Sequence, residues 1–154
     1  MALIEIETYC LTKPGAYLEW PFGPKFPVIK VKAPSQEKGR IFAQPFMLRG
    51  EPKGTLNCDR MTGELYRAIY PGTVTRGYHC PPIQQPYFNT VNLDGTVPDD
   101  MLIEMIDHAY KVVVEKANPE NYKIIHHSQI SCLHQQYFFR WRVPVGYFSI
   151  HQRV

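Results

Sequence analysis

Residues 26–47, FPVIKVKAPSQEKGRIFAQPFM, indicate the fold class of this chain. The first part, Phe26 to Lys32, is rich in β-branched residues and predicts a strand. Residues 33–39 are polar and contain proline and glycine, which predicts a hairpin loop longer than a tight turn. Arg40 to Met47 is the expected returning strand, and Pro45 confines that stretch to a sheet edge or a strand end. The segment therefore predicts two adjacent antiparallel strands.

Apolar residues at helical spacing predict helices on both sides of this hairpin. Residues 3–10 are expected to form a first helix, which Pro14 and Gly15 end, although the alternation at residues 3–6 also permits a strand. A second helix follows Asp59, an N-cap residue, and stops at Pro71. The apolar positions that share one face of this second helix are Met61, Leu65, Ala68 and Ile69. The best specified helix runs over residues 98–117, and its apolar stripe consists of Leu102, Met105, Ile106, Ala109 and Val113.

Two further short strands are expected, at residues 55–58 and 89–93, where apolar and polar residues alternate. Residues 73–88 carry several glycines and prolines and predict a loop. Strands and helices therefore follow one another without regular strand–helix–strand units. This order predicts an α+β fold, an antiparallel sheet with helices packed on one face.

Length and composition fit one domain of ordinary size. The chain has 154 residues, 44% of them apolar, which is enough to bury a core. A formal net charge of +3 is too small to indicate a nucleic-acid or membrane protein by itself. No apolar run has the length of a membrane span, and residues 1–20 lack the pattern of a signal peptide. We therefore expect a cytoplasmic protein with free thiols and no contact with a membrane.

The charges are segregated along the chain. Between residues 25 and 53 there are seven basic side chains and two acidic ones, whereas residues 94–107 carry five acids and no lysine or arginine. Three of these acids, Asp100, Glu104 and Asp107, project from one side of the predicted last helix. An acidic helix surface that attracts hard cations is therefore one alternative function, the least favoured one.

The sequence contains none of the common catalytic or cofactor-binding motifs, such as Gly-x-Ser-x-Gly or a phosphate-binding glycine loop. His79 and Cys80 are adjacent, but neighbouring side chains on an extended chain point apart, which is poor geometry for a thiol and its base. Cys132 and His134 lack the spacing of a zinc site. We expect a protein that is not an enzyme and that holds no cofactor and no metal; an uncharacterised hydrolase or transferase is the less favoured alternative.

A series of short motifs resembles the MmcQ/YjbR family over about residues 1–117. In chain order they are Pro14-Gly15, Trp20-Pro-Phe-Gly-Pro24, Val28–Val31, Phe42-Ala43, Leu56-Asn-Cys-Asp59, Pro71-Gly72, Gly77-Tyr-His79, Asn89-Thr-Val91, Leu93-Asp-Gly95, Pro98-Asp99 and Asp107-His-Ala-Tyr110. The resemblance implies a fold like that of the frataxin-like CyaY group and of double-wing DNA-binding domains. It also implies a DNA-binding function without an established enzymatic activity.

The basic hairpin is the expected DNA-binding element. Lys30 and Lys32 share one face of their strand, and two strands with a basic loop could approach a duplex as a β-ribbon or wing. Such contacts would be mainly to phosphate. The candidate contacts to double-stranded DNA are Lys25, Lys30, Lys32, Lys38, Arg40, Arg49, Lys53, Arg76 and His79.

Residues 80–88 suggest a different function. Family members typically carry a short basic segment and a tryptophan here, whereas this chain has Cys-Pro-Pro-Ile-Gln-Gln-Pro-Tyr-Phe, uncharged and with Phe88 in the tryptophan's place. Ile83, Tyr87 and Phe88 could form an adhesive apolar patch. The alternative to DNA binding is therefore a module that recognises a protein or a small ligand through this loop.

Residues 118–154 extend the chain beyond the family-like domain. They contain seven aromatic residues and no sustained helical period. Because exposed aromatic residues promote aggregation, we expect part of this extension to pack on the domain, on a protein partner or on a second copy of the chain. The alternative is a lineage-specific or accidental extension that adds no function.

Overall fold

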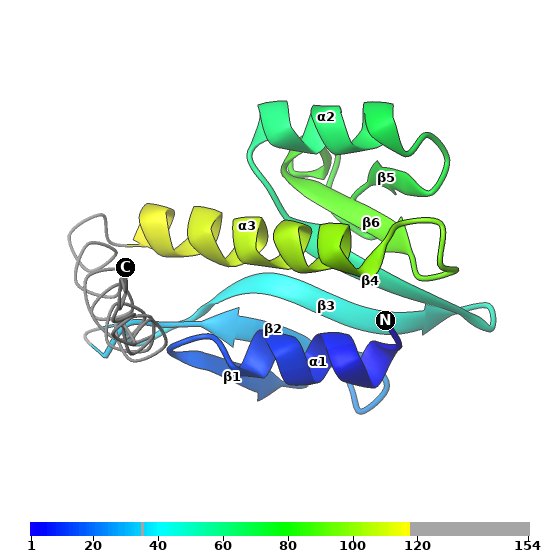
Figure 1. The fold of residues 1–154 in the computed structure, drawn as a ribbon. Coiled ribbons are helices and arrows are strands. Elements are labelled where there is room, and N and C mark those ends of the chain that lie inside the picture. Colours follow the sequence, from blue (N-terminus) through cyan, green and yellow to red (C-terminus); the bar gives the residue numbers. More distant parts are fainter. Residues whose placement is uncertain (35, 118–154) are drawn as a thin grey trace, which may run out of the picture. The chain divides into compact units, whose positions relative to one another are not determined.

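The computed structural model describes residues 1–34 and 36–117 (Figure 1). All of these residues belong to one compact unit. The expected C-terminal extension, residues 118–154, and the contacts predicted for it lie outside the described residues.

A six-stranded antiparallel sheet forms the centre of the described unit, with strand order β1-β2-β3-β4-β6-β5. Every pair of neighbouring strands is antiparallel, and β2 and β3 form the predicted hairpin. The α+β class is therefore confirmed. The strands are β1 (Ala16–Glu19), β2 (Val28–Val31), β3 (Arg40–Leu48), β4 (Glu51–Asn57), β5 (Val74–Arg76) and β6 (Phe88–Asn92).

Three α-helices pack on one face of the sheet. They are α1 (Leu3–Leu11), α2 (Arg60–Ile69) and α3 (Asp99–Ala117). Figure 1 shows α3 running along β3. The ring of Tyr110 of α3 lies 5.7 Å from the ring of Phe42 of β3. On the same face, Asn89 of β6 points at α2 and donates from Nδ2 to the Gly63 carbonyl at 3.3 Å. A short 3₁₀ helix, η1 (Gln85–Tyr87), leads into β6.

The core lies between α3, α1 and the sheet. The whole predicted stripe of α3 is buried, and Ile106 and Ala109 have no exposed surface. Ile6 and Cys10 of α1 are buried as well. Each large side chain buried in this way contributes about 1.5–3 kcal/mol. Helical spacing therefore identified the correct faces of α1 and α3.

The apolar face of α2 points to solvent. Met61, Leu65 and Ile69 are 80%, 55% and 50% exposed, whereas the buried residues of the helix are Gly63 and Tyr66. The three apolar side chains share a face, as their spacing predicts, but none of the described residues covers that face. Spacing alone could not show that α2 turns its glycine and tyrosine toward the sheet.

Two short strands were not predicted from the sequence. Strand β1 is an edge strand of four residues, and β5, with three residues, lies inside the segment predicted as a loop. Both have a single neighbour, so they are held by one ladder each. Strand β4 also begins earlier than predicted, because Arg49 and Gly50 both have positive φ angles, 51° and 85°, and form a two-residue hairpin turn.

Pro45 lies where its strand is locally an edge. Strand β3 is an interior strand, but its pairing with β2 ends at Ala43, while its pairing with β4 continues to Leu48. The missing N–H of Pro45 therefore faces no partner strand on the β2 side. The prediction of an edge position was correct for this part of the strand and wrong for β3 as a whole.

Candidate functional site

The sheet face opposite the helices carries a candidate binding site. Because Asn89 points toward α2, its neighbour Thr90 points to the opposite face. Thr55 of β4 is paired with Thr90, and Gln44 of β3 is paired with Thr55. These three polar side chains therefore form a row across three strands. We call this side of the sheet the outer face.

A β-bulge in β3 brings one more side chain to the outer face. Ile29 of β2 is paired with Ala43, but the next residue, Lys30, is paired with Ile41, so that Phe42 is an additional residue. Without the bulge, Ile41 and Gln44, three positions apart, would point to opposite faces. With it, both reach the same cavity on the outer face.

This outer-face cavity has a volume of about 500 Å³. Its floor comes from β3 and β4, and its walls come from the segment before β2 and from the segment that leads into β6. The residues that line it are Phe22, Phe26, Ile41, Gln44, Thr55, Tyr78, His79, Cys80, Pro81, Gln84 and Phe88. Four of these are phenylalanine or tyrosine, and none is Lys, Arg, Asp or Glu. The lining is therefore rich in aromatic side chains and has no permanently charged group.

The wall formed by residues 77–81 is tightly constrained. A Cβ atom on Gly77 would come within 2.6 Å of Phe88 Cβ and 2.8 Å of Cys80 Sγ, so only glycine fits there. The next residue, Tyr78, donates its backbone N–H to Thr90 Oγ1 at 2.8 Å. Thr90 Oγ1 also lies 2.7 Å from Thr55 Oγ1. The wall is thus hydrogen-bonded to the floor of the cavity.

His79 and Cys80 both line the cavity, which the sequence analysis did not expect. His79 has φ 63°, in the left-handed region, so the chain is not extended at this point and the two side chains do not point apart. Burial raises the pKa of the Cys80 thiol, the opposite of the shift that activates a nucleophilic cysteine. His79 and Cys80 therefore form part of the cavity wall, and the raised thiol pKa argues against a role of Cys80 as a nucleophile with His79 as its base.

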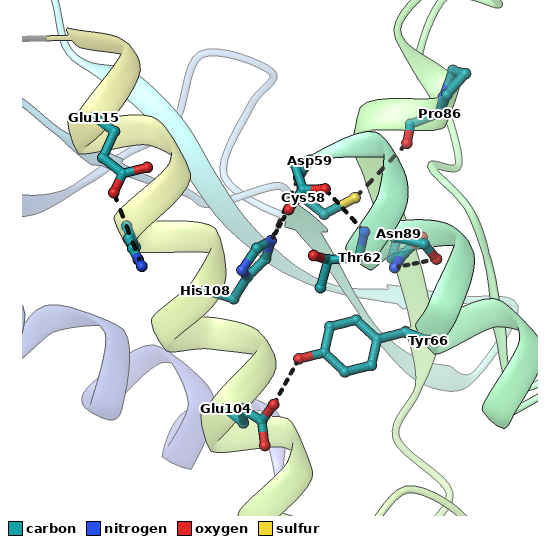
Figure 2. A network of polar contacts seen from close by, with 11 residues as sticks. Cys58, Asp59, Thr62, Tyr66, Pro86, Asn89, Glu104, His108 and Glu115 are labelled. Atoms are coloured by element: carbon teal, nitrogen blue, oxygen red, sulfur yellow. Dashed lines mark hydrogen bonds and ion pairs between the residues drawn. The ribbon is translucent and has the colours of Figure 1, made fainter. Parts of the chain in front are cut away.

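A second polar cluster joins α2 to α3 (Figure 2). His108 Nε2 lies 3.0 Å from Asp59 Oδ2, and the Tyr66 hydroxyl donates to Glu104 Oε1 at 3.1 Å. Burial, followed by the nearby Glu104 carboxylate, raises the pKa of Tyr66 to about 12. Burial also raises the pKa of Cys58 to about 11. Both groups therefore keep their protons near neutral pH, and the cluster serves to fasten two helices.

Three acids of the last helix are engaged separately by other elements, whereas Asp100 accepts the backbone N–H of Met101 in its own helix. Asp107 lies 2.6 Å from Lys13 Nζ and accepts a hydrogen bond from the Tyr9 hydroxyl. Glu104 binds Tyr66, and Asp99 pairs with the N-terminal ammonium group of Met1. Within residues 1–34 and 36–117, no group of three or more His, Cys, Asp or Glu side chains could hold a metal ion.

The sequence and the fold match known proteins. The model of the YjbR family matches residues 11–112. The chain belongs to the YjbR family. An uncharacterised protein of Escherichia coli O157:H7, YbdF, is 30% identical over 105 residues, which cover 68% of this chain and 78% of YbdF. The MmcQ/YjbR resemblance of the sequence is thereby confirmed.

Two solved structures share the fold of this YjbR domain. A Deinococcus radiodurans protein, DR2400, has a TM-score of 0.66 and 29% identity, covering 75% of this chain and 80% of its own. A Pseudomonas syringae protein has a TM-score of 0.57 and 14% identity, covering 73% of this chain and 99% of its own. At that lower identity the likeness concerns the fold alone.

The basic residues of the YjbR domain do not form one patch. Lys32, Lys38 and Arg40 lie at the tip of the β2–β3 hairpin, whereas Arg49 lies in the turn at the other end of β3. The nine residues of β3 separate these ends by roughly 30 Å at about 3.3 Å per residue. The candidate DNA contacts are therefore divided between two ends of the sheet.

Several of these basic side chains are also engaged by other residues. Lys30 Nζ lies 2.5 Å from Glu19, and Lys53 Nζ lies 2.7 Å from Asn92 Oδ1 and 3.0 Å from Glu51. Of the three remaining candidates, Lys25 lies beside α1, Arg76 is exposed at the end of β5, and His79 lines the outer-face cavity.

In the same YjbR domain, no helix among the described residues has the length and apolar character needed to cross a membrane. The thiols of Cys10, Cys58 and Cys80 are free, and the fourth cysteine, Cys132, lies outside the described residues.

Proposed function

We propose that this YjbR domain binds a small organic molecule in its outer-face cavity. The observation that carries the proposal is a cavity of about 500 Å³ whose walls are mainly aromatic. Ligand sites in proteins are typically concave, apolar and roughly 300–1,000 Å³ in volume, with a few polar groups that orient the ligand. Gln44, Thr55, His79 and Gln84 are the polar groups available in this cavity.

The constrained wall supports this function further. Gly77 and the hydrogen bond from Tyr78 to Thr90 hold residues 77–81 against the sheet. A cavity that exists before the ligand arrives avoids the entropic cost of ordering a loop on binding. The sequence suggested ligand binding by the loop 80–88 as an alternative function. Only part of this loop belongs to the proposed site: Cys80, Pro81, Gln84 and Phe88 line the cavity, whereas Ile83 is 82% exposed.

A pair of matched variants tests the proposal. Phe22 lines the cavity and is 64% exposed, and Trp20, two residues earlier, is 52% exposed and does not line it. We expect the full-length protein to bind the neutral, environment-sensitive dye Nile red saturably. Phe22→Ala should weaken this binding about tenfold or more, which corresponds to about 1.4 kcal/mol. Trp20→Ala should change the affinity for the dye less than about twofold, because this side chain lies outside the cavity lining.

The opposite results would remove the proposal. Absence of saturable dye binding, or equal losses in the Phe22→Ala and Trp20→Ala proteins, would mean that the dye does not report on this cavity. Both variants change exposed side chains, so little effect on folding is expected. Circular dichroism of both proteins checks this.

Duplex DNA binding by the hairpin tip is a second candidate. It is favoured by Lys32, Lys38 and Arg40, which are all exposed and lie close together in the β2–β3 hairpin. Each phosphate contact contributes about 0.9 to the slope of log K against log salt concentration. The triple variant Lys32→Glu, Lys38→Glu, Arg40→Glu should therefore bind duplex DNA more weakly, with a slope smaller by about 3. Unchanged affinity and slope in a folded variant would exclude this tip as the contact.

A further inference from the structure

We propose that the molecule bound in the outer-face cavity is an uncharged, planar nitrogen heterocycle of the purine type, recognised through the side-chain amide of Gln44. The inference rests on the proposed binding function of the cavity and specifies the class of ligand. Three properties of the lining carry it: the aromatic walls, the position of the amide, and the lack of ionised groups.

The aromatic walls select a flat ligand. Phe22 and Phe26 come from the segment before β2, and Tyr78 and Phe88 come from the opposite wall. The Tyr78 ring is itself packed, with the Phe46 ring 6.2 Å away in a stacked arrangement and the His79 ring at 3.9 Å. Rings held in this way offer faces on which another ring can stack, worth about 1–3 kcal/mol for a base on an aromatic side chain.

Gln44 provides the polar recognition. Its side chain reaches the cavity from β3 and is half-buried, and its amide has no hydrogen-bond partner among the described residues. A glutamine amide presents a donor and an acceptor side by side. This pattern matches the edge of adenine, where an amino group lies next to a ring nitrogen. A heterocycle would satisfy both groups of this half-buried amide at once, whereas an apolar ring would cover them without offering a partner.

Thr55 adds a polar atom beside Gln44. The two residues are directly paired across β3 and β4, so their side chains lie next to each other on the floor of the cavity. The Thr55 hydroxyl is held in place by Thr90 at 2.7 Å, and Thr90 also accepts the backbone N–H of Tyr78. The floor thus offers a fixed hydroxyl and an unpaired amide to one edge of a ring.

The lack of ionised groups restricts the ligand further. No lysine or arginine lines the cavity, so a phosphate attached to the heterocycle would find no cation there. No aspartate or glutamate lines it either, which gives no preference for a cationic ligand. Transfer of an unpaired charge into such surroundings is strongly unfavourable. A free base or another uncharged derivative therefore fits better than a nucleotide.

The test compares three probes on the full-length protein by calorimetric titration: adenine, indole and adenosine monophosphate. Indole is planar and aromatic but lacks the adjacent donor and acceptor of adenine. We expect adenine to bind more tightly than either indole or the nucleotide. Gln44→Met, which keeps the length of the side chain and removes the amide, should weaken adenine binding about tenfold and change indole binding less than about twofold.

A matched control and a second variant secure the interpretation. Gln36→Met makes the same change in the β2–β3 loop, outside the cavity lining, and should leave adenine binding unchanged. Gln44→Glu is nearly isosteric with the natural residue and replaces the amide donor by a charge, so it should also lose adenine binding. It provides the same comparison if the methionine variant folds poorly.

The outcomes separate the two proposals. Binding of indole and Nile red without adenine would overturn the heterocycle inference and leave the cavity as a site for apolar ligands. Tighter binding of the nucleotide than of adenine would overturn the uncharged class, and an unchanged adenine affinity in Gln44→Met would overturn the role of the amide. If none of these probes and no dye binds, both the inference and the proposed function fail.

Discussion

Asp59 Oδ2 lies 3.0 Å from His108 Nε2, which ties the first residue before α2 to the middle of α3. The other carboxylate oxygen of Asp59 accepts the backbone N–H of Thr62 at 2.9 Å and caps α2. One carboxylate therefore fixes both the start of α2 and its position against α3. Asp59 was expected from the sequence as an N-cap, and this part of the prediction is confirmed.

The ionisation of Asp59 is expected to affect stability at acid pH. Burial alone would raise the pKa of this carboxyl, but hydrogen bonds from Thr62 and the nearby His108 outweigh it, and the pKa is lowered from 3.8. A group whose pKa is lowered by folding stabilises the folded state above its unfolded pKa, and the stabilisation is lost as pH falls through the folded value. Asp59→Asn keeps an N-cap and cannot ionise, so its melting temperature should fall less than that of the natural protein below about pH 4.

Asp59→Ala serves as the control for capping. It removes the cap as well as the charge, and it should cost about 0.5–2 kcal/mol at neutral pH. Thermal melts between pH 7 and pH 2.5 distinguish the variants. If the melting temperatures of the Asp59→Asn protein and the natural protein fall equally between pH 7 and pH 2.5, ionised Asp59 does not stabilise the fold.

The exposed apolar face of α2 leads to a second prediction. Because Leu65 is 55% exposed, Leu65→Ala should change the free energy of unfolding by less than about 0.5 kcal/mol. Ile106 of α3 has no exposed surface, and Ile106→Ala should cost about 2–5 kcal/mol. Urea unfolding measures both. A loss for Leu65→Ala comparable with that for Ile106→Ala would indicate that the face of α2 is covered in solution.

Two glycines form a matched pair for the cavity wall. A Cβ atom on Gly77 would come within 2.6 Å of Phe88, whereas one on Gly54 of β4 would meet no atom within 4 Å. Gly77→Ala should therefore lose about 1–3 kcal/mol of stability through overpacking and weaken the binding of Nile red. Gly54→Ala should keep its stability or gain up to about 1 kcal/mol. Equal melting temperatures for the two variants would contradict the close packing at Gly77.

A chain ending at Ala117 is expected to fold. Its core residues, including Leu102 and Val113 of α3, are already buried among the described residues. Thermal unfolding of the shortened chain should therefore be cooperative. A product that aggregates or melts without a transition would show that residues 118–154 complete the core.

Local patterns predicted the hairpin and α3 because their signals lie within a few neighbouring residues. The β-branched run at Val28 and the apolar stripe around Ile106 each report directly on a strand or a helix face. The outer-face cavity depends instead on register. Thr55 and Gln44 read as ordinary polar strand positions, and only the pairing of β3 with β4 brings them together.

Some signal of the cavity was present in the sequence. Residues 80–88 were singled out as an apolar loop, and part of that loop does form a cavity wall. Phe22 and Phe26 lie in a segment rich in proline and glycine, where aromatic residues have no role in regular structure. The number of basic residues along the hairpin was a poor guide to the charge available for DNA, because the sequence does not show that Lys30 is paired with Glu19.

The bulge at Phe42 makes the cavity floor sensitive to insertions and deletions. Adding or removing one residue between Phe42 and Gln44, with the bulge kept, would place Ile41 and Gln44 on opposite faces of the sheet. Point substitutions can therefore tune the site during evolution, whereas a change of one residue in the length of β3 would dismantle it. When this chain is aligned with a relative, residues before and after Phe42 face the same way as those of the relative only if both strands carry the bulge.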